Sequence, residues 1–193
     1  MPAGNHLFRN KGNWQFEDVT VYAHASGGHR STFSVVWLDA NNDGWPDVYV
    51  PNEFGQGVLL INQRNGTFKE HKIQDGREDY GTMGLTAGDF DNDGNIDLYM
   101  GNMYSKAGMR VIGNLKPGSY SPEITARLQS LVAGSQLHRN LGNLKFEQKG
   151  KSWQINDCGW AYGMAAVDLD NDGWLDLYAT AGFISRDRNK PDG

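Results

Sequence analysis

The sequence has few or none of the features that mark several common classes of protein. The 193 residues include one cysteine, so no framework of disulfides can hold the fold. No apolar run reaches the roughly 18 to 20 residues that cross a bilayer, so no transmembrane segment is expected. The first residues lack the basic and then apolar pattern of a signal peptide. The basic residues are scattered and form no stripe, which disfavours nucleic acid as a partner.

Acidic residues, in contrast, are concentrated in three places. Segments 39–47, 89–97 and 168–176 contain three, four and four aspartates, which are eleven of the 23 carboxylates. Without these eleven, the formal net charge of −5 would be +6. Such a local concentration of negative charge indicates cation sites rather than a diffuse acidic surface. Three bound divalent ions would bring the net charge to about +1.

The chain contains three copies of one sequence unit. Asn10, Asn62 and Asn140 are each followed by a phenylalanine six residues later. The first aspartate of an acidic segment comes 29, 27 and 28 residues after these asparagines. Fixed offsets of this kind indicate tandem repeats within a single region, residues 1–193, and the repeats are 7–52, 58–102 and 136–183.

Each repeat has the pattern of short antiparallel strands. In the first copy, segments 34–38 and 47–50 flank the acidic segment, 58–62 follows, and Asn65-Gly66 predicts a hairpin turn into 67–71. Units of about fifty residues with four strands favour an all-β fold built from β-propeller blades. A stacked solenoid is the alternative, but solenoid repeats are usually shorter and their strands are parallel.

An insert, residues 103–135, separates the second and third repeats. Ser121 is suited to cap a helix, Pro122 to occupy its first position, and Gly134 to end it. We therefore expect a short helix near residues 121–133. This helix either packs over one face of the blades or binds a partner.

The three acidic segments share one pattern of oxygen-bearing side chains. Counted from the first aspartate, positions 1, 3, 5 and 9 carry Asp or Asn, and position 6 is always Gly. Calcium takes about six to eight oxygen ligands, and a tight loop can supply them from alternate residues and a backbone carbonyl. Metals that prefer thiolates are excluded, because the segments contain no Cys or His. Tight turns without a metal are the alternative.

EF-hand loops begin in the same way but differ at position 12. An EF-hand has a bidentate Glu there, whereas this chain has Val50, Met100 and Ala179. The residues that flank each segment have strand propensity, so each loop is expected to join two strands rather than two helices. The EF-hand interpretation is therefore rejected.

The acidic loops, together with units such as Leu7-Phe8-Arg9-Asn10, resemble the FG-GAP or VCBS repeats of bacterial extracellular proteins. The chain is similar in particular to the cartilage acidic protein family and, more distantly, to the propellers of integrin α-chains. The resemblance implies one calcium ion in each loop, with the backbone carbonyl of position 7 completing the ligands. The implied ligands are Asp39, Asn41, Asp43, Trp45 and Asp47, then Asp89, Asp91, Asp93, Asn95 and Asp97, then Asp168, Asp170, Asp172, Trp174 and Asp176. Because Asn41 carries no charge, the first site is expected to be the weakest.

The resemblance also implies an extracellular or periplasmic module that binds or scaffolds other molecules and is not catalytic. Sites with the affinity of extracellular calcium modules, about 10⁻⁴ M, would stay empty in the cytosol, which agrees with this location. The ligand, protein or glycan, is not identified by the sequence. The alternative is a carbohydrate-binding or carbohydrate-active propeller, a lectin or lyase, whose ligand faces Trp45, Trp174 or the loop of His24 and His29.

The strand pattern leaves half a blade at each end of the sequence. Residues 7–20 supply the last two strands of a blade, 31–73 and 83–150 supply two full blades, and 160–182 supply the first two strands of another. Three blade equivalents are too few for an ordinary ring of about four to eight blades. Two copies could share two composite blades in a homodimer with a six-bladed ring. Alternatively, the chain is a piece of a longer propeller that has further blades.

Overall fold

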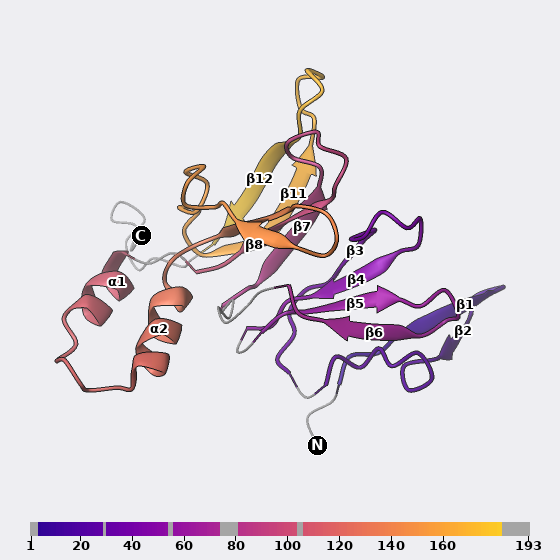
Figure 1. The fold of residues 1–193 in the computed structure, drawn as a ribbon, viewed down its shortest axis with the longest axis horizontal. Helices are drawn as coiled ribbons and strands as arrows, with labels where there is room; N and C mark the ends of the chain where they lie inside the picture. Colours follow the sequence, from indigo (N-terminus) through magenta and orange to yellow (C-terminus); the bar gives the residue numbers. More distant parts are fainter. Residues whose placement is uncertain (1–3, 29, 54–55, 74–80, 104–105, 183–193) are drawn as a thin grey trace.

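In the part of the chain that the structure describes, four antiparallel sheets follow one another, and two helices lie beside them (Figure 1). The first sheet is a hairpin of β1 (Phe8–Gly12) and β2 (Gln15–Asp18). The last sheet pairs β11 (Ala161–Val167) with β12 (Asp176–Ala181). The computed structural model describes residues 4–28, 30–53, 56–73, 81–103 and 106–182.

The two inner sheets have four strands each, in sequence order across the sheet. The second sheet contains β3 (Val36–Leu38), β4 (Asp47–Val50), β5 (Val58–Asn62) and β6 (Phe68–His71). The third sheet contains β7 (Gly84–Gly88), β8 (Asp97–Gly101), β9 (Gln136–Asn140) and β10 (Phe146–Gln148). In both sheets each strand pairs with the next strand along the chain, although the insert that contains the two helices separates β8 from β9 in sequence. These sheets confirm the predicted all-β fold with four-stranded antiparallel blades.

The hydrophobic core lies between neighbouring sheets. One cluster joins side chains of the second and third sheets, among them Tyr49, Leu59, Leu98 and Met100. A second cluster joins the segment after β2 to the second sheet, with Val19, Ala23, Val48, Val58 and Leu60. Strands β4 and β8 are buried along their whole length. Because both faces of an inner sheet are covered by other sheets, these strands are apolar on both sides rather than alternating.

Glycines in β7 and β8 allow the last sheet to approach the third one closely. A Cβ atom at Gly84 would lie 2.5 Å from the carbonyl oxygen of Tyr162. A Cβ atom at Gly88 would lie 2.6 Å from Leu175 Cδ1, and one at Gly101 would meet the side chain of Met164. The missing side chains therefore set the distance between these two sheets.

The predicted helix is present as α2 (Pro122–Leu131). Ser121 is its N-cap, and its Oγ accepts a hydrogen bond from the backbone N–H of Ile124 at 3.3 Å. No residue of α2 is fully buried, and α2 contacts α1 (Lys106–Gly113) rather than covering the face of a sheet. Helix α1 was not predicted; its first turn carries no acidic residue, and its third residue is Gly108, which has low helix propensity.

Among the described residues, no helix combines the length and the apolar character that crossing a membrane requires.

We expect Gly84→Ala to lower the free energy of unfolding by about 1–3 kcal/mol, because its methyl group would press on backbone atoms that cannot rotate away. Gly113→Ala is the control, since a Cβ atom there meets nothing within 4 Å. Urea denaturation of the two variants measures the difference. Equal stabilities would show that the third and fourth sheets do not pack as closely as described.

Candidate metal centres

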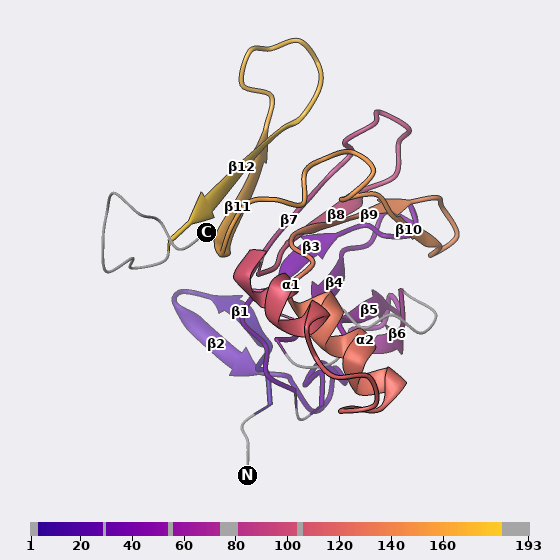
Figure 2. The same cartoon turned by 90° about the vertical axis from the view of Figure 1, so that its left-hand side faces the viewer.

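The three acidic loops occupy corresponding places in three neighbouring sheets. Each loop joins the first two strands of its sheet: β3 to β4, β7 to β8 and β11 to β12. In Figure 1 the loops project from the same side of the sheets, and in Figure 2 the loop between β11 and β12 extends furthest from them. The structure therefore places all three predicted sites on one side of the molecule.

The aspartate at position 1 holds each loop in its turn. Its carboxylate accepts hydrogen bonds from the backbone N–H groups of positions 5 and 6, over 2.7 to 3.1 Å. Charged acceptors make stronger hydrogen bonds than neutral ones, which stabilises the turn. The acceptors and their donors are Asp39 with Asp43 and Gly44, Asp89 with Asp93 and Gly94, and Asp168 with Asp172 and Gly173.

Positions 4 and 6 of each loop have left-handed backbone conformations. At position 4 the φ angles are 57°, 56° and 60°, and the residue is always Asn, namely Asn42, Asn92 and Asn171. At position 6 the φ angles are 81°, 86° and 90°, and the residue is always Gly. Asn enters this region more readily than other side chains, and Gly does so without strain. These two residues turn the chain back so that positions 1, 3 and 5 face one another.

In the second and third loops, the carboxylates at positions 1, 3 and 5 converge. One oxygen each from Asp89, Asp91 and Asp93 lies within 4.8 Å of the other two, and the third loop has the same arrangement with Asp168, Asp170 and Asp172. Asp91 Oδ1 is buried and accepts no hydrogen bond from the described residues. An unpaired buried acceptor is costly, so this oxygen fits a bound cation. The residues present therefore suit a hard divalent ion.

The first loop differs at position 3. Asn41 Oδ1 accepts a hydrogen bond from the backbone N–H of Asp43 at 3.1 Å, and Asn41 Nδ2 donates to Asp43 Oδ2 at 3.2 Å. The amide thus turns a donor toward the carboxylate where the other loops present a second negative charge. This contact explains physically why the first loop is the poorest candidate for a cation.

The aspartate at position 9 connects each loop to its sheet. Asp97 is fully buried, and it accepts hydrogen bonds from the backbone N–H groups of Phe90 (3.1 Å) and Asn140 (2.7 Å). Asp47 makes the corresponding bonds to Ala40 (3.0 Å) and Asn62 (2.7 Å). A carboxylate oxygen has a second lone pair, so these bonds leave capacity for a cation.

Burial of Asp97 and Asp47 disfavours their charged form. It raises the pKa of Asp97 to about 6, and the negative charges of Asp91 and Asp93 contribute in the same direction. Burial also raises the pKa of Asp47, with smaller contributions from Asp43 and Asp39. A divalent cation beside these groups would favour the ionised form.

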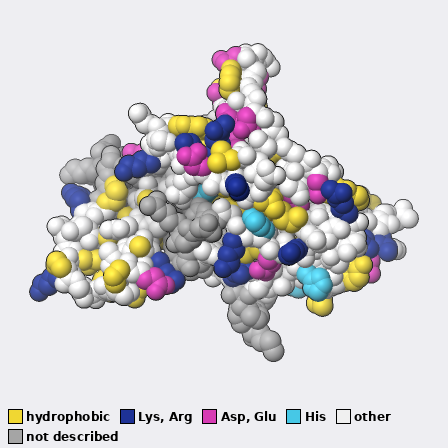
Figure 3. All heavy atoms as spheres, viewed as in Figure 1, with side chains coloured by type: hydrophobic (Ala, Val, Ile, Leu, Met, Phe, Trp, Pro, Cys, Tyr) yellow, Lys and Arg dark blue, Asp and Glu magenta, His cyan; other side chains and the backbone are white. Residues whose placement is uncertain are grey.

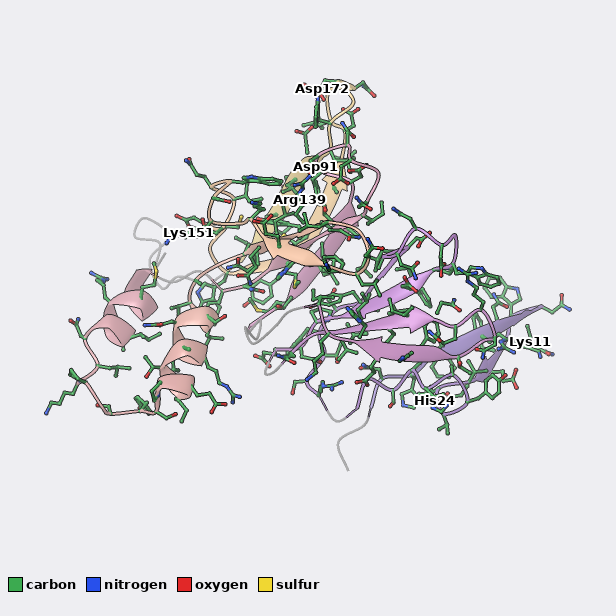
Figure 4. The ribbon with its side chains drawn as sticks, viewed as in Figure 1. Lys11, His24, Asp91, Arg139, Lys151 and Asp172 are labelled. Carbon is green, nitrogen blue, oxygen red and sulfur yellow. The ribbon has the colours of Figure 1, made fainter. Side chains whose placement is uncertain are left out.

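Two arginines that the sequence analysis did not assign contact the acidic loops. Arg64 Nη2 lies 3.0 Å from Asp43 Oδ2, and this hydrogen bond lowers the pKa of Asp43. Arg139 donates from Nε to Asp91 and from Nη2 to Asp93, the latter over 3.1 Å. Figure 4 shows Arg139 beside Asp91. The clue in the sequence was the Arg-Asn pair at 9–10 and 139–140, which recurs at the start of two repeats.

The asparagines at position 4 also have a role that the sequence analysis missed. Asn42 Nδ2 donates to the carbonyl oxygen of Gly94 (3.2 Å) and to Asn95 Oδ1 (2.9 Å) in the second loop. Asn92 Nδ2 donates to the carbonyl oxygen of Gly173 (3.1 Å) in the third loop. Each loop is therefore linked to the next one along the chain.

The position 7 residues turn their backbone toward the loop. The N–H groups of Trp45, Asn95 and Trp174 donate to the position 5 carboxylates over 2.8 to 2.9 Å. The Trp45 and Trp174 side chains are exposed, at 44% and 53% of their surface.

His24 is also exposed, on a separate loop, and Figure 4 shows it far from Asp91. His29 lies outside the described residues.

The fold and the loops together define a class of protein. Its members are tandem arrays of antiparallel blades, and an acidic loop that can hold a cation joins the first two strands of successive blades. A family model described as FG-GAP-like repeat matches residues 2–50, 39–100 and 129–179. These matches cover more than half of the chain, so the chain belongs to the FG-GAP-like repeat family, as the resemblance predicted.

Among curated proteins, the chain is similar to cartilage acidic protein 1 of Mus musculus. The two are 25% identical over 181 residues, which are 92% of this chain and 25% of the mouse protein. The chain thus spans about a quarter of the length of this relative.

We expect the Asp97 carboxyl group to titrate near pH 6 in the metal-free protein. Because its folded-state pKa lies above the unfolded value of about 4, the stability contributed by its protonated form is present below about pH 4 and is lost as the pH rises to about 6. Carbon-13 NMR of the carboxyl groups measures this midpoint. Asp18 is the internal comparison, since hydrogen bonds from Thr20 lower its pKa to about 2. A midpoint near 4 for Asp97 would contradict its burial.

Proposed function

We propose that this chain is a calcium-binding propeller module of an extracellular or periplasmic protein, used for binding or scaffolding and not for catalysis. The observation that carries the proposal is the convergence of three carboxylates in a loop whose Asp91 Oδ1 is buried without a hydrogen-bond donor among the described residues. Ions of opposite charge are the usual partners of such a group. The three loops would then hold three calcium ions.

The donor set favours calcium over other divalent ions. Each loop offers oxygens of Asp and Asn side chains, and calcium prefers oxygen ligands in flexible cages of about six to eight. The ligands would be the side chains at positions 1, 3, 5 and 9 and the carbonyl of position 7. Magnesium demands octahedral geometry and retains water, so a loop with this many protein oxygens suits it less well.

The proposed location follows from affinity. With a dissociation constant of about 10⁻⁴ M, millimolar calcium would stabilise the fold by about 1.4 kcal/mol per site. Cytosolic calcium would be far too low for such sites, whereas extracellular calcium would fill them. The bound ions would hold the loops on one side of the blades, where an exposed and rigid surface could contact a partner.

A carbohydrate ligand is the second candidate. Trp45 and Trp174 hold the same loop position in two blades, and both side chains are exposed. Exposed indole rings of this kind can stack on sugars as well as on neighbouring side chains. A glycan array, probed with and without calcium, separates a lectin-like module from one that binds proteins.

We expect saturating calcium to raise the melting temperature by roughly 10 °C, because three sites together contribute about 4 kcal/mol. Magnesium at the same concentration should raise it much less. Differential scanning calorimetry in calcium, in magnesium and in chelator tests this. Identical melting in calcium and in chelator would reject the metal sites.

Position 3 offers a matched pair of variants for the charge dependence of binding. Asp91→Asn should reduce the calcium-induced stabilisation, because the second loop loses a negative charge beside the ion. Asn41→Asp should increase it, while lowering stability in chelator, where two carboxylates would face each other without a cation. Calorimetry of both variants with and without calcium gives the two shifts. Shifts of the same sign in both variants would be inconsistent with calcium at these loops.

We expect Arg139→Gln to tighten calcium binding by about tenfold, because a guanidinium near the same carboxylates repels a dication. In chelator, the same change should lower stability, since Asp91 and Asp93 lose their counter-charge. Isothermal titration with calcium measures the affinity. Arg127→Gln is the control, because Arg127 pairs with Glu123 on α2. Weaker binding in the Arg139 variant would make this arginine part of the calcium site instead of its competitor.

A further inference from the structure

The first and second acidic loops are joined on their exposed side by a chain of side-chain hydrogen bonds. Asn42 Nδ2 donates to Asn95 Oδ1 over 2.9 Å and to the carbonyl oxygen of Gly94 over 3.2 Å. Asn95 Nδ2 in turn donates to Asp93 Oδ1 over 2.9 Å. Asn42 stands between positions 3 and 5 of the first loop, and Asp93 is position 5 of the second. The amide of Asn95 therefore connects the candidate cation ligands of one loop to those of the other.

A second chain of hydrogen bonds joins the same two loops in the interior. The Ala40 N–H donates to Asp47 Oδ2 over 3.0 Å, and the Ala40 carbonyl accepts from Asn140 Nδ2, also over 3.0 Å. The Asn140 N–H donates to Asp97 Oδ1 over 2.7 Å. Asp47 and Asp97 are the position 9 carboxylates of the two loops, and all four residues are at most 1% exposed. One backbone unit and one asparagine thus connect the buried carboxylates of neighbouring loops.

The buried chain holds its geometry firmly. In surroundings of low dielectric constant a hydrogen bond is electrostatically stronger than in water, and bonds in a chain polarise one another. Breaking a bond of this chain would leave a buried polar group without its partner, at a cost of about 1–3 kcal/mol. The first and second loops therefore do not adjust the positions of their carboxylates independently.

The exposed link recurs between the next two loops. Asn92, at position 4 of the second loop, donates from Nδ2 to the carbonyl oxygen of Gly173 in the third loop over 3.1 Å. Figure 3 shows Asp and Glu side chains at the surface of the projecting β11–β12 loop and at its base. Ions from solvent can reach these side chains directly. The link through a position 4 asparagine is thus a feature of the repeat and not of one loop.

From the two hydrogen-bonded chains we infer that cation binding in the first and second loops is cooperative, so that an occupied second loop raises the affinity of the first. This inference rests on the proposed calcium binding and adds the regulation of those sites. Binding in the second loop fixes Asp93 and Asp97, and the two chains then hold Asn42 and Asp47 in place. The first loop loses less conformational freedom when it binds its own cation. By linkage, the first loop raises the affinity of the second by the same factor.

The charges of the two loops set the order in which they fill. The second loop has four aspartates, whereas the first has three and the neutral Asn41, so the second loop attracts a dication more strongly. Its occupation then compensates through the hydrogen bonds for the charge that the first loop lacks. The two loops consequently fill, and become rigid, over a narrower range of calcium concentration than independent sites would.

Charge alone predicts the opposite effect of one loop on the other. The four aspartates of the second loop with a bound dication have a formal charge of −2, whereas the loop with Asp91→Ala and no ion has −3. This variant loop stays empty while the first loop fills, because it lacks an oxygen that Asn41 still supplies there. A more negative neighbour attracts a cation to the first loop more strongly. Asp91→Ala therefore strengthens binding at the first loop if only charge acts, and weakens it if the hydrogen bonds couple the loops.

The experiment measures the occupancy of the first loop by terbium, a trivalent ion that takes oxygen ligands as calcium does. Trp45 holds position 7 of this loop, and an indole ring beside bound terbium sensitises the luminescence of the ion. Trp174→Phe removes the corresponding signal of the third loop, and the second loop has Asn95 at this position. In this background, Asp91→Ala should lower the terbium affinity of the first loop by about fivefold to tenfold, a usual size for coupling between sites. Competition with calcium gives the same comparison for calcium itself.

Further variants test whether the hydrogen bonds carry the coupling. Asn42→Gly keeps the left-handed backbone at this position, where φ is 57°, and removes the amide that reaches the second loop. It should reduce the effect of Asp91→Ala on the first loop to about twofold or threefold, and adding Asn140→Ala should abolish the effect. The matched control is Asn171→Gly, which makes the same change at the same position of the third loop, where φ is 60°. This control should leave the effect of Asp91→Ala unchanged.

An unchanged or higher affinity of the first loop in Asp91→Ala would overturn the proposal. The full effect of Asp91→Ala in a chain without the Asn42 and Asn140 amides would do so too. Urea denaturation checks that the Asn140→Ala variant folds, because it leaves the carbonyls of Ala40 and Ile96 without this donor. If it does not fold, the full effect in Asn42→Gly alone overturns the proposal. Absence of terbium and calcium binding in the unmodified chain is a separate result, which would reject the metal sites themselves.

Discussion

In the two four-stranded blades, the hydrogen bonds of the buried carboxylate at position 9, Asp47 or Asp97, are the contacts on which the rest of the blade depends. Asp97 joins the start of its acidic loop, through the Phe90 N–H, to the third strand of the blade, through the Asn140 N–H. The same residue begins β8, so loop, second strand and third strand are fixed at one point. Asn140 then donates its side-chain amide to the carbonyls of Ile96, in its own blade, and Ala40, in the preceding one. One carboxylate thus organises both the blade and its contact with a neighbour.

Burying this carboxylate beside other carboxylates costs electrostatic free energy, and the positively charged groups around it offset that cost. A buried carboxylate next to further carboxylates is unfavourable in its charged form, as the raised pKa of Asp97 shows. Arg139 offsets part of this repulsion by pairing with Asp91 and Asp93. A bound dication would offset it more fully, because it carries two charges and can contact all the carboxylates at once. The carboxylates that hold the acidic loop in its blade are therefore the same groups that would bind a cation.

Neighbouring sheets are held together by apolar packing away from the acidic loops and by hydrogen bonds between the loops. Away from the loops, apolar clusters fill the space between the sheets, and the glycines of β7 and β8 bring β11 close. On the loop side, asparagine amides link one acidic loop to the next. Because every inner sheet uses both of its faces, Tyr49 and Tyr99 are buried there, whereas the equivalent Tyr178 of the last described sheet is exposed. In repeat architectures each unit contacts mainly its neighbours, so the burial of a blade depends on the blades on either side of it.

The sequence by itself determined the features that depend on neighbouring residues: the repeat, the strands, the acidic loops with Asn and Gly at their left-handed positions, and the Ser121 cap of α2. Turn chemistry and capping act over a few residues, so spacing reveals them. Only the tertiary structure decided that Arg139 pairs with Asp91, that Asn42 reaches Gly94, and that Asp97 is buried while its repeat equivalent Asp176 is exposed. These contacts join residues tens of positions apart, and their presence depends on which sheet lies beside which, a property that no local pattern encodes.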